Sequence, residues 1–261
     1  MTNQEQGVAV VTGATSGIGE AVATLLAERG HRVFLCARDQ GNVDATVERL
    51  RKEGHDVDGR TCDVRSTGQI RRFVAAAVER YGPVGVLVNN AGRSGGGTTA
   101  QITDELWREV METNLGGVFR MTRAVLTHGG MLERGSGRIV NIASTGGKQG
   151  VMFGAPYSAS KHGVVGFTKA LGLELAKTGV TVNAVCPGYV ETPMAQRVRK
   201  GYAEFWETSE EEVLNRFEAK IPLGRYSTPR EVAGLVGYLV TDTAASITAQ
   251  ALNVCGGLGN Y

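Results

Sequence analysis

The feature that most constrains the fold is a regular alternation of short apolar segments with longer segments of helical spacing. Most of the short segments are apolar along their whole length, which is typical of strands covered on both faces. Repeated β–α units with short connections predict an α/β fold: one doubly wound parallel sheet of seven strands with helices on both faces. The predicted strands are Val8–Thr12, Arg32–Ala37, Val57–Cys62, Val86–Asn89, Arg138–Ala143, Thr181–Cys186 and Ala251–Val254, and the predicted helices include Gly17–Arg29, Thr67–Tyr81, Asp104–Leu126 and Ala155–Lys177.

The domain organisation predicted from this pattern is simple. A chain of 261 residues is long enough for one large domain, and no linker or low-complexity tract divides it. One segment departs from the alternation: residues 191–221 form a long mixed stretch with several aromatic side chains, between the sixth and seventh predicted strands. We therefore predict a single catalytic domain over residues 1–261, with a substrate lid at 191–221.

Charge and cysteine content exclude several classes of protein. The 28 basic and 26 acidic residues give a formal net charge of +2, which is too balanced for a nucleic-acid or membrane-surface protein. The chain begins with a polar segment, and no apolar stretch approaches the roughly 20 residues that span a bilayer. We expect a cytoplasmic protein without a metal site, whose four scattered cysteines are free, buried thiols: Cys36, Cys62, Cys186 and Cys255.

A glycine-rich turn follows the first predicted strand directly. Residues 12–19 read Thr-Gly-Ala-Thr-Ser-Gly-Ile-Gly and lead at once into a predicted helix. Glycines at these positions permit a tight turn and a close approach of the backbone to a pyrophosphate, which the free N–H groups of the helix start can bind. Because the turn lies between a strand and a helix, it predicts a dinucleotide-binding (Rossmann) site rather than a plain glycine-rich loop.

The residue after the second predicted strand indicates which dinucleotide binds. A carboxylate about twenty residues after the glycine motif would bind the ribose 2′-hydroxyl of NAD, but position 38 is Arg38. A guanidinium suits the 2′-phosphate of NADPH, which we therefore predict as the cofactor, although Asp39 follows directly. Asp63, after the third predicted strand, could meet the adenine amino group or, equally, could cap a turn.

A tyrosine and a lysine four residues apart carry the predicted chemistry. Tyr157 and Lys161 are at the start of a predicted helix, where this spacing places both side chains on one face. We expect the ammonium, together with an oxidised nicotinamide, to lower the tyrosine pKa from near 10 so that the phenol becomes an effective acid. Ser144 ends the fifth predicted strand, at the edge where α/β sheets bind ligands, and could hold a substrate carbonyl.

These motifs together resemble the short-chain dehydrogenase/reductase family over nearly the whole chain. The resemblance rests on the glycine motif, Asn-Asn-Ala-Gly at 89–92, Ser144 thirteen residues before Tyr157, Lys161, and Pro-Gly at 187–188 followed by Thr192. It implies that Tyr157 protonates the carbonyl oxygen, Lys161 lowers its pKa and holds the nicotinamide ribose, Ser144 orients the carbonyl, and Asn114 anchors a water relay. The implied cofactor contacts are Gly13, Thr15, Ser16, Gly17, Ile18, Gly19, Arg38, Asp63, Val64, Asn90, Ala91, Gly92, Tyr157, Lys161, Pro187, Gly188, Val190 and Thr192.

A sharper resemblance, carried by segments 90–97, 144–150, 186–194 and 252–261, is to ketoreductases of aromatic (type II) polyketide synthases of the actinorhodin type. It implies reduction of one ketone of a polyketide chain carried on an acyl carrier protein, by an enzyme of a family that is commonly tetrameric. The sequence departs from the subgroup's pattern at Ser94, where a proline often precedes two glycines. That loop would border the substrate channel, so neither the ketone nor the alcohol configuration is predicted.

Three arginines follow three strand ends: Arg38, Arg65 and Arg93 come after the second, third and fourth predicted strands. We hypothesise that Arg38 binds the 2′-phosphate while Arg65 and Arg93 receive an acidic carrier protein or its phosphopantetheine arm; three solvated loop arginines are the alternative. The alternatives are a 3-oxoacyl-acyl-carrier-protein reductase of fatty-acid synthesis, a reductase of small free ketones and a non-catalytic NADPH-binding regulator. The intact set of Asn114, Ser144, Tyr157 and Lys161 argues against the regulator.

Overall fold

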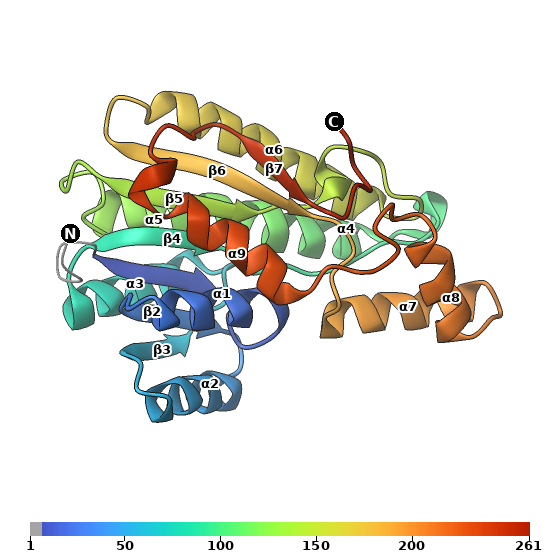
Figure 1. The fold of residues 1–261 in the computed structure, drawn as a ribbon, viewed down its shortest axis with the longest axis horizontal. Coiled ribbons are helices and arrows are strands. Elements are labelled where there is room, and N and C mark those ends of the chain that lie inside the picture. Colours follow the sequence, from blue (N-terminus) through green and yellow to red (C-terminus); the bar gives the residue numbers. More distant parts are fainter. Residues whose placement is uncertain (1–6) are drawn as a thin grey trace.

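The computed structural model describes residues 7–261, which fold around one parallel sheet (Figure 1). Its seven strands lie in the order β3-β2-β1-β4-β5-β6-β7. The order reverses between β1 and β4, so the doubly wound fold predicted from the sequence is confirmed. The strands are β1 (Val8–Thr12), β2 (Val33–Ala37), β3 (Val57–Thr61), β4 (Val84–Asn89), β5 (Gly137–Ile142), β6 (Val180–Pro187) and β7 (Ala251–Val254).

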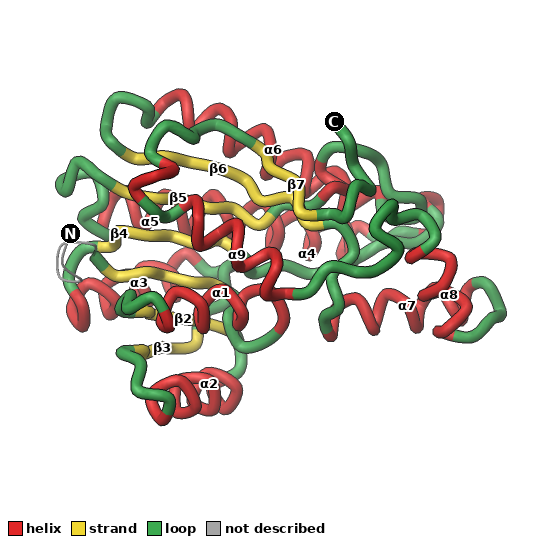
Figure 2. The backbone as a smooth tube through the Cα atoms, in the orientation of Figure 1, coloured by secondary structure: helices red, strands yellow, loops and turns green. Residues whose placement is uncertain are grey.

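Helices cover both faces of this sheet, as Figure 2 shows. On one face α1 and α9 pack together over a core that includes Leu26 and Val236. On the other face α3 and α5 pack over a second core that includes Phe73 and Met121. The α-helices are α1 (Gly17–Glu28), α2 (Gln40–Lys52), α3 (Thr67–Tyr81), α4 (Asp104–Met111), α5 (Gly117–His128), α6 (Ala155–Glu174), α7 (Pro193–Phe205), α8 (Glu210–Glu218) and α9 (Pro229–Leu239).

The predicted helix Asp104–Leu126 differs in the structure. It is divided into α4 and α5 by a π-helical segment, η2 (Glu112–Gly116), and it continues to His128. A π segment inserts a wider turn into a helix and recurs at functional sites. Here it contains Asn114, whose side chain is fully buried. The structure therefore places one predicted catalytic residue at an irregularity that apolar periodicity does not reveal.

The predicted lid, residues 191–221, contains α7 and α8, which pack against each other. Val213, Phe217 and Ile221 from this region form a small separate core. Tyr189, just before the segment, stacks on Phe217 with ring centroids 4.8 Å apart. This segment therefore has its own packing, separate from the cores on the sheet, while its movement as a lid stays a prediction.

Three further properties bear on the sequence analysis. All four cysteines are buried and free, as predicted. Between residues 7 and 261, no helix combines the length and apolar character needed to cross a membrane. In the same residues, no group of three or more His, Cys, Asp and Glu side chains is arranged to hold a metal ion.

Candidate active site

The predicted site residues gather at one edge of the sheet. In a parallel sheet the carboxyl ends of the strands lie at the same edge, and ligands bind there where the strand order reverses. The glycine-rich turn follows β1, residues 90–92 follow β4, Ser144 follows β5, and residues 188–192 follow β6. Because β1 and β4 are the neighbours at the reversal, the structure brings the cofactor turn and the catalytic residues to the same place.

Ser144, Tyr157 and Lys161 form the centre of this site. Ser144 precedes the short helix η3 (Thr145–Gly147), and its hydroxyl accepts a hydrogen bond from the Gly146 N–H at 3.0 Å. The same hydroxyl is hydrogen-bonded with the phenol of Tyr157, on the first turn of α6. One turn later the Lys161 Nζ lies 5.8 Å from the centroid of the Tyr157 ring. The three side chains predicted from sequence are therefore neighbours.

Electrostatics within the site depend mainly on burial. Burial has the largest effect on Tyr157 and raises its pKa above the ordinary value of 10, while the hydrogen bond with Ser144 acts in the opposite direction. Burial also lowers the pKa of Lys161, to about 8. Its Nζ donates to the Ile142 carbonyl oxygen at 2.8 Å. The protein's own groups therefore raise the pKa of Tyr157, with burial as the largest cause. The expected lowering by Lys161 together with oxidised nicotinamide stays a prediction.

Asn114 links three parts of the site. Its Oδ1 accepts from the Arg93 N–H at 2.8 Å, and its Nδ2 donates to the Arg93 carbonyl at 3.0 Å and to Ser160 Oγ at 3.1 Å. The Ser160 hydroxyl in turn donates to the Tyr157 carbonyl at 2.7 Å. The side chain predicted to anchor a water relay thus has a structural role: it joins η2, the loop after β4 and the start of α6.

The glycine-rich turn has the shape that a dinucleotide pyrophosphate needs. A Cβ on Gly19 would lie 2.2 Å from the Gly13 carbonyl oxygen, and a Cβ on Gly13 would lie 2.8 Å from the Ala91 Cα, so the chain fits only without side chains. Ser16 is the N-cap of α1, but its side chain makes no capping hydrogen bond. The first N–H groups of α1 therefore have no side-chain acceptor and can bind a phosphate.

The far end of the nucleotide site contains the residues predicted to select the cofactor. Arg38 is exposed at the end of β2. Asp39 is the N-cap of α2 and accepts from the Asn42 N–H at 2.8 Å, so its carboxylate serves the helix. Because the Asp39 carboxylate caps the helix, the neighbouring Arg38 guanidinium suits the 2′-phosphate of NADPH. Asp63 pairs with Arg65 at 2.6 Å, and this neighbour holds the pKa of the Asp63 carboxyl below its usual range.

The remaining predicted cofactor residues line the same edge. Gly17, at φ +58°, is packed against Thr192, the N-cap of α7, and Val190 forms a bridge with Ser227. Other predicted residues lie on the loops after β1, β3, β4 and β6: Thr15 and Ile18 in the glycine-rich turn, Val64 packed against Gly117, Asn90, Ala91 and Gly92 after β4, Pro187 as the last residue of β6, and Gly188 following it.

Comparison with known proteins places this site in a family. The family model described as short chain dehydrogenase matches residues 7–203. The chain belongs to the short-chain dehydrogenase family. Across 100% of both chains it is 69% identical to a protein of Streptomyces virginiae assigned as the ketoacyl reductase of the monensin polyketide synthase. It is 39% identical, over 98% of each chain, to the 3-oxoacyl-acyl-carrier-protein reductase of Vibrio cholerae.

A solved structure with the same architecture supports the same family. The crystal structure of a variant of actinorhodin polyketide ketoreductase with NADPH superposes with a TM-score of 0.97, at 66% identity over 100% of both chains. The resemblance noted in the sequence analysis, to this subgroup of short-chain dehydrogenases, is therefore confirmed. Like its relatives, the chain is an oxidoreductase that acts between a ketone and a hydroxyl group, with NADPH as its cofactor.

Two residues that support this short-chain dehydrogenase site were not identified from the sequence. Thr12 Oγ1 accepts from the N–H groups of Asn90 and Ala91, both at 3.0 Å, and so joins the end of β1 to the loop after β4. Ser160 bridges Asn114 and Tyr157. Both residues lie inside recognised motifs, yet their partners are distant in sequence, so motif spacing alone did not reveal the contacts.

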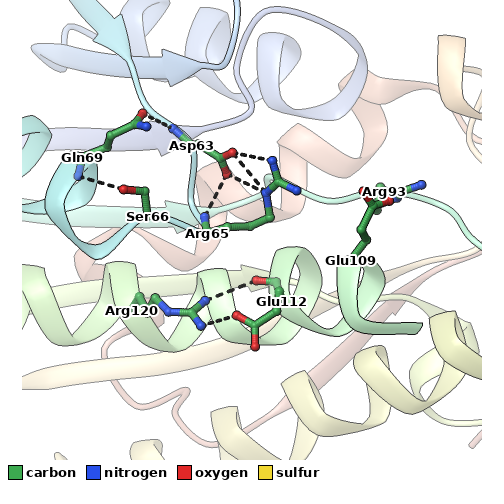
Figure 3. A network of polar contacts seen from close by, with 8 residues as sticks. All are labelled: Asp63, Arg65, Ser66, Gln69, Arg93, Glu109, Glu112 and Arg120. Carbon is green, nitrogen blue, oxygen red and sulfur yellow. Dashed lines mark hydrogen bonds and ion pairs between the residues drawn. The ribbon is translucent and has the colours of Figure 1, made fainter. Parts of the chain in front are cut away.

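The arginines beside this short-chain dehydrogenase site have carboxylate partners (Figure 3). Arg65 contacts Asp63 through Nε and Nη2, and Arg93 contacts Glu109 of α4. Arg38 also lies close enough to Asp63 to lower the pKa of its carboxyl. The three guanidiniums follow β2, β3 and β4 at one edge of the sheet, as predicted, but two of their charges are offset by ion pairs.

Proposed function

We propose that this chain is an NADPH-dependent ketoreductase that reduces one ketone of a polyketide chain carried on an acyl carrier protein. The observation that carries the proposal is the contact of Ser144 with Tyr157, one turn before Lys161, at the edge of the sheet where the strand order reverses. The chain that holds this site is 69% identical to a protein assigned as a polyketide ketoacyl reductase. The identity to a 3-oxoacyl-acyl-carrier-protein reductase is lower, 39%, so a reductase of fatty-acid synthesis is the second candidate function.

We assign the proton-transfer role to Tyr157. Burial raises the pKa of its phenol and so favours the protonated form, which can donate to a carbonyl oxygen held by the Ser144 hydroxyl. Lys161 contributes a buried positive charge beside the ring, and Asn114 holds the surrounding backbone. The cofactor supplies the hydride when bound, and the protein supplies the proton.

We assign the parts of NADPH to separate loops at this edge. We assign the pyrophosphate to the turn at 13–19, where the α1 N–H groups lack side-chain acceptors, and the 2′-phosphate to Arg38. We assign binding of the adenosine to residues 63–64 and 90–92. We assign binding of the nicotinamide end to Tyr157, Lys161 and residues 187–192.

The chemical assignment is tested by replacing Tyr157 with Phe. Because the lost proton acts in the transition state, we expect turnover of a ketone to fall by at least about 100-fold while NADPH affinity stays within about 2-fold.

The substrate class is tested by comparing the rates of reduction of trans-1-decalone and of an acetoacetyl thioester. Preference for the bicyclic ketone supports the polyketide reading; preference for the thioester would move the assignment to fatty-acid synthesis.

Carrier-protein docking is assigned to Arg65 and Arg93. Both are about two-fifths exposed, and a guanidinium has five N–H donors, so each can bind a further anion while paired. Replacing Arg93 with Glu should raise KM for carrier-bound substrate and spare a free bicyclic ketone. Arg80, ion-paired with Asp58 at the C-terminal end of α3, gives a matched charge-reversal control. Equal losses for both substrates would refute docking.

A further inference from the structure

The last segment of the chain lies against the catalytic serine turn. We call residues 253–261, the end of β7 and the residues that follow it, the strap. Since β7 is parallel to β6, the strap leaves the sheet at the same edge as the candidate active site, and the C-terminus lies beyond the end of β7 in Figure 1. The serine turn comprises residues 144–148: Ser144, the short helix η3 and Lys148.

Contacts between the strap and the serine turn come from both sides. The Tyr261 hydroxyl donates to the Thr145 carbonyl at 3.4 Å. Lys148 Nζ donates to the Asn253 side-chain oxygen at 2.8 Å and to the main-chain oxygen of Tyr261 at 3.3 Å. The same ammonium lies 5.5 Å from the centroid of the Tyr261 ring. Lys148 and Tyr261 therefore connect the two segments by hydrogen bonds and by a cation–π contact.

The strap has a defined internal conformation, so it can act as a fixed support. Asn253 Nδ2 donates to the Gly259 carbonyl at 2.9 Å, and the Gly259 N–H donates to Cys255 Sγ at 3.4 Å. Gly256 and Gly257 have φ values of +61° and +88°, which permit the chain to reverse there. These contacts place Tyr261 back over the serine turn.

The serine turn in turn sets the position of the Ser144 hydroxyl. Within it the Gly147 N–H donates to the Ser144 carbonyl at 2.9 Å, and the Lys148 N–H donates to the Thr145 carbonyl at 2.9 Å. The Gly146 N–H donates to the Ser144 hydroxyl itself. A shift of the carbonyl that Tyr261 contacts would therefore move the group that faces Tyr157.

We propose that Lys148 and Tyr261 are positioning residues that hold Ser144 Oγ beside Tyr157 for ketone reduction. The inference rests on the proposed function, since it assigns the strap to the same reaction. Neither side chain touches the reacting atoms; both act through the serine turn. Misplacement of a catalytic group by about 1 Å can cost up to about 100-fold in rate, so modest loosening should be measurable in kcat.

The test compares Lys148→Met and Tyr261→Phe with Lys148→Arg and with Tyr238→Phe, whose phenol is exposed on α9. We expect kcat for trans-1-decalone to fall about 10-fold in Lys148→Met and on the order of 3-fold in Tyr261→Phe. The dissociation constant for NADPH, measured by fluorescence titration, should stay within about 2-fold in every variant. Lys148→Arg should restore most of kcat, because an arginine can still donate to both oxygens.

A second readout is independent of catalysis. Amide hydrogen exchange at residues 145–149 should become faster in Lys148→Met and Tyr261→Phe, and should be unchanged in Tyr238→Phe. Wild-type kcat and wild-type exchange in both Lys148→Met and Tyr261→Phe would overturn the proposal, as would an equal loss in Tyr238→Phe. If the wild-type protein itself reduced no ketone with NADPH, the proposed function would fail instead, while faster exchange would still report the support of the turn.

Discussion

Replacing Lys161 with Met should change how the stability of the protein depends on pH. The buried ammonium has a pKa of about 8, whereas the same group in the unfolded chain has its ordinary value of 10.5. Between these two values the unfolded state binds more protons than the folded state, so the stability contributed by this group rises with pH. Below pH 8 the wild-type protein therefore carries the full cost of burying a charge, and above about pH 10.5 it carries none of it.

The magnitude follows from the two pKa values. At about 1.36 kcal/mol per pH unit, lowering the pKa from 10.5 to about 8 corresponds to about 3 kcal/mol of unfolding free energy at neutral pH. Methionine removes that cost but leaves the buried Ile142 carbonyl without the Nζ donor, which costs about 1–3 kcal/mol at every pH. The pH dependence is therefore the sharper quantity: relative to wild type, Lys161→Met should lose about 2 kcal/mol between pH 7 and about pH 9.5.

Urea unfolding of both proteins at several pH values, without added cofactor, measures this difference. The wild type and the variant share Tyr157 and Cys186, so the titration of those neighbours largely cancels in the comparison. Lys169→Met, on the exposed face of the same helix, is the matched control, and its difference from wild type should show no such trend. A Lys161→Met difference that stays constant from pH 7 to about pH 9.5 would refute the burial of a charged lysine.

Three further substitutions have expected outcomes. Asn114→Ala removes three hydrogen bonds, two of them to the backbone of Arg93, so thermal unfolding should report a loss of about 3 kcal/mol; a loss below about 1 kcal/mol would contradict the linking role. Gly19→Ala places a Cβ 2.2 Å from the Gly13 carbonyl oxygen, so α1 must shift. The Kd for NADPH, measured by fluorescence titration, should therefore rise at least about 10-fold, and an unchanged Kd would argue against pyrophosphate binding by the glycine-rich turn. Arg38→Ala should raise the Kd for NADPH about 10- to 100-fold and spare NADH; equal effects on both would remove the arginine from the 2′-phosphate.

The sheet and the catalytic core could be predicted because both depend on local patterns. Continuous apolar runs locate strands that are covered on both faces, and a four-residue spacing places Tyr157 and Lys161 on one helix face. A glycine motif of this spacing between a strand and a helix is typical of a phosphate-binding turn. Each of these signals lies within a few residues of its consequence, so the sequence carries it without knowledge of the fold.

The features that were missed depend on contacts between distant residues. The π segment Glu112–Gly116 changes the hydrogen-bond register of a helix, and its apolar periodicity hardly differs from that of a continuous helix. The pairing of Arg93 with Glu109 and the contacts of Ser160 depend on which elements meet in space. The effect of burial, which raises the Tyr157 pKa, was missed for a similar reason: desolvation is a property of the whole surroundings, whereas a neighbouring charge can be read from spacing.

The use of Asp39 as a helix cap has a consequence for engineering coenzyme preference. A redesign toward NADH needs a carboxylate that accepts hydrogen bonds from the ribose 2′-hydroxyl. The carboxylate of Asp39, which directly follows Arg38, already accepts a hydrogen bond from the first turn of α2. Freeing it would weaken that helix by about 1 kcal/mol, the usual worth of such a cap. A new acid introduced at position 38 would avoid this loss and would remove, in the same step, the arginine proposed to bind the 2′-phosphate.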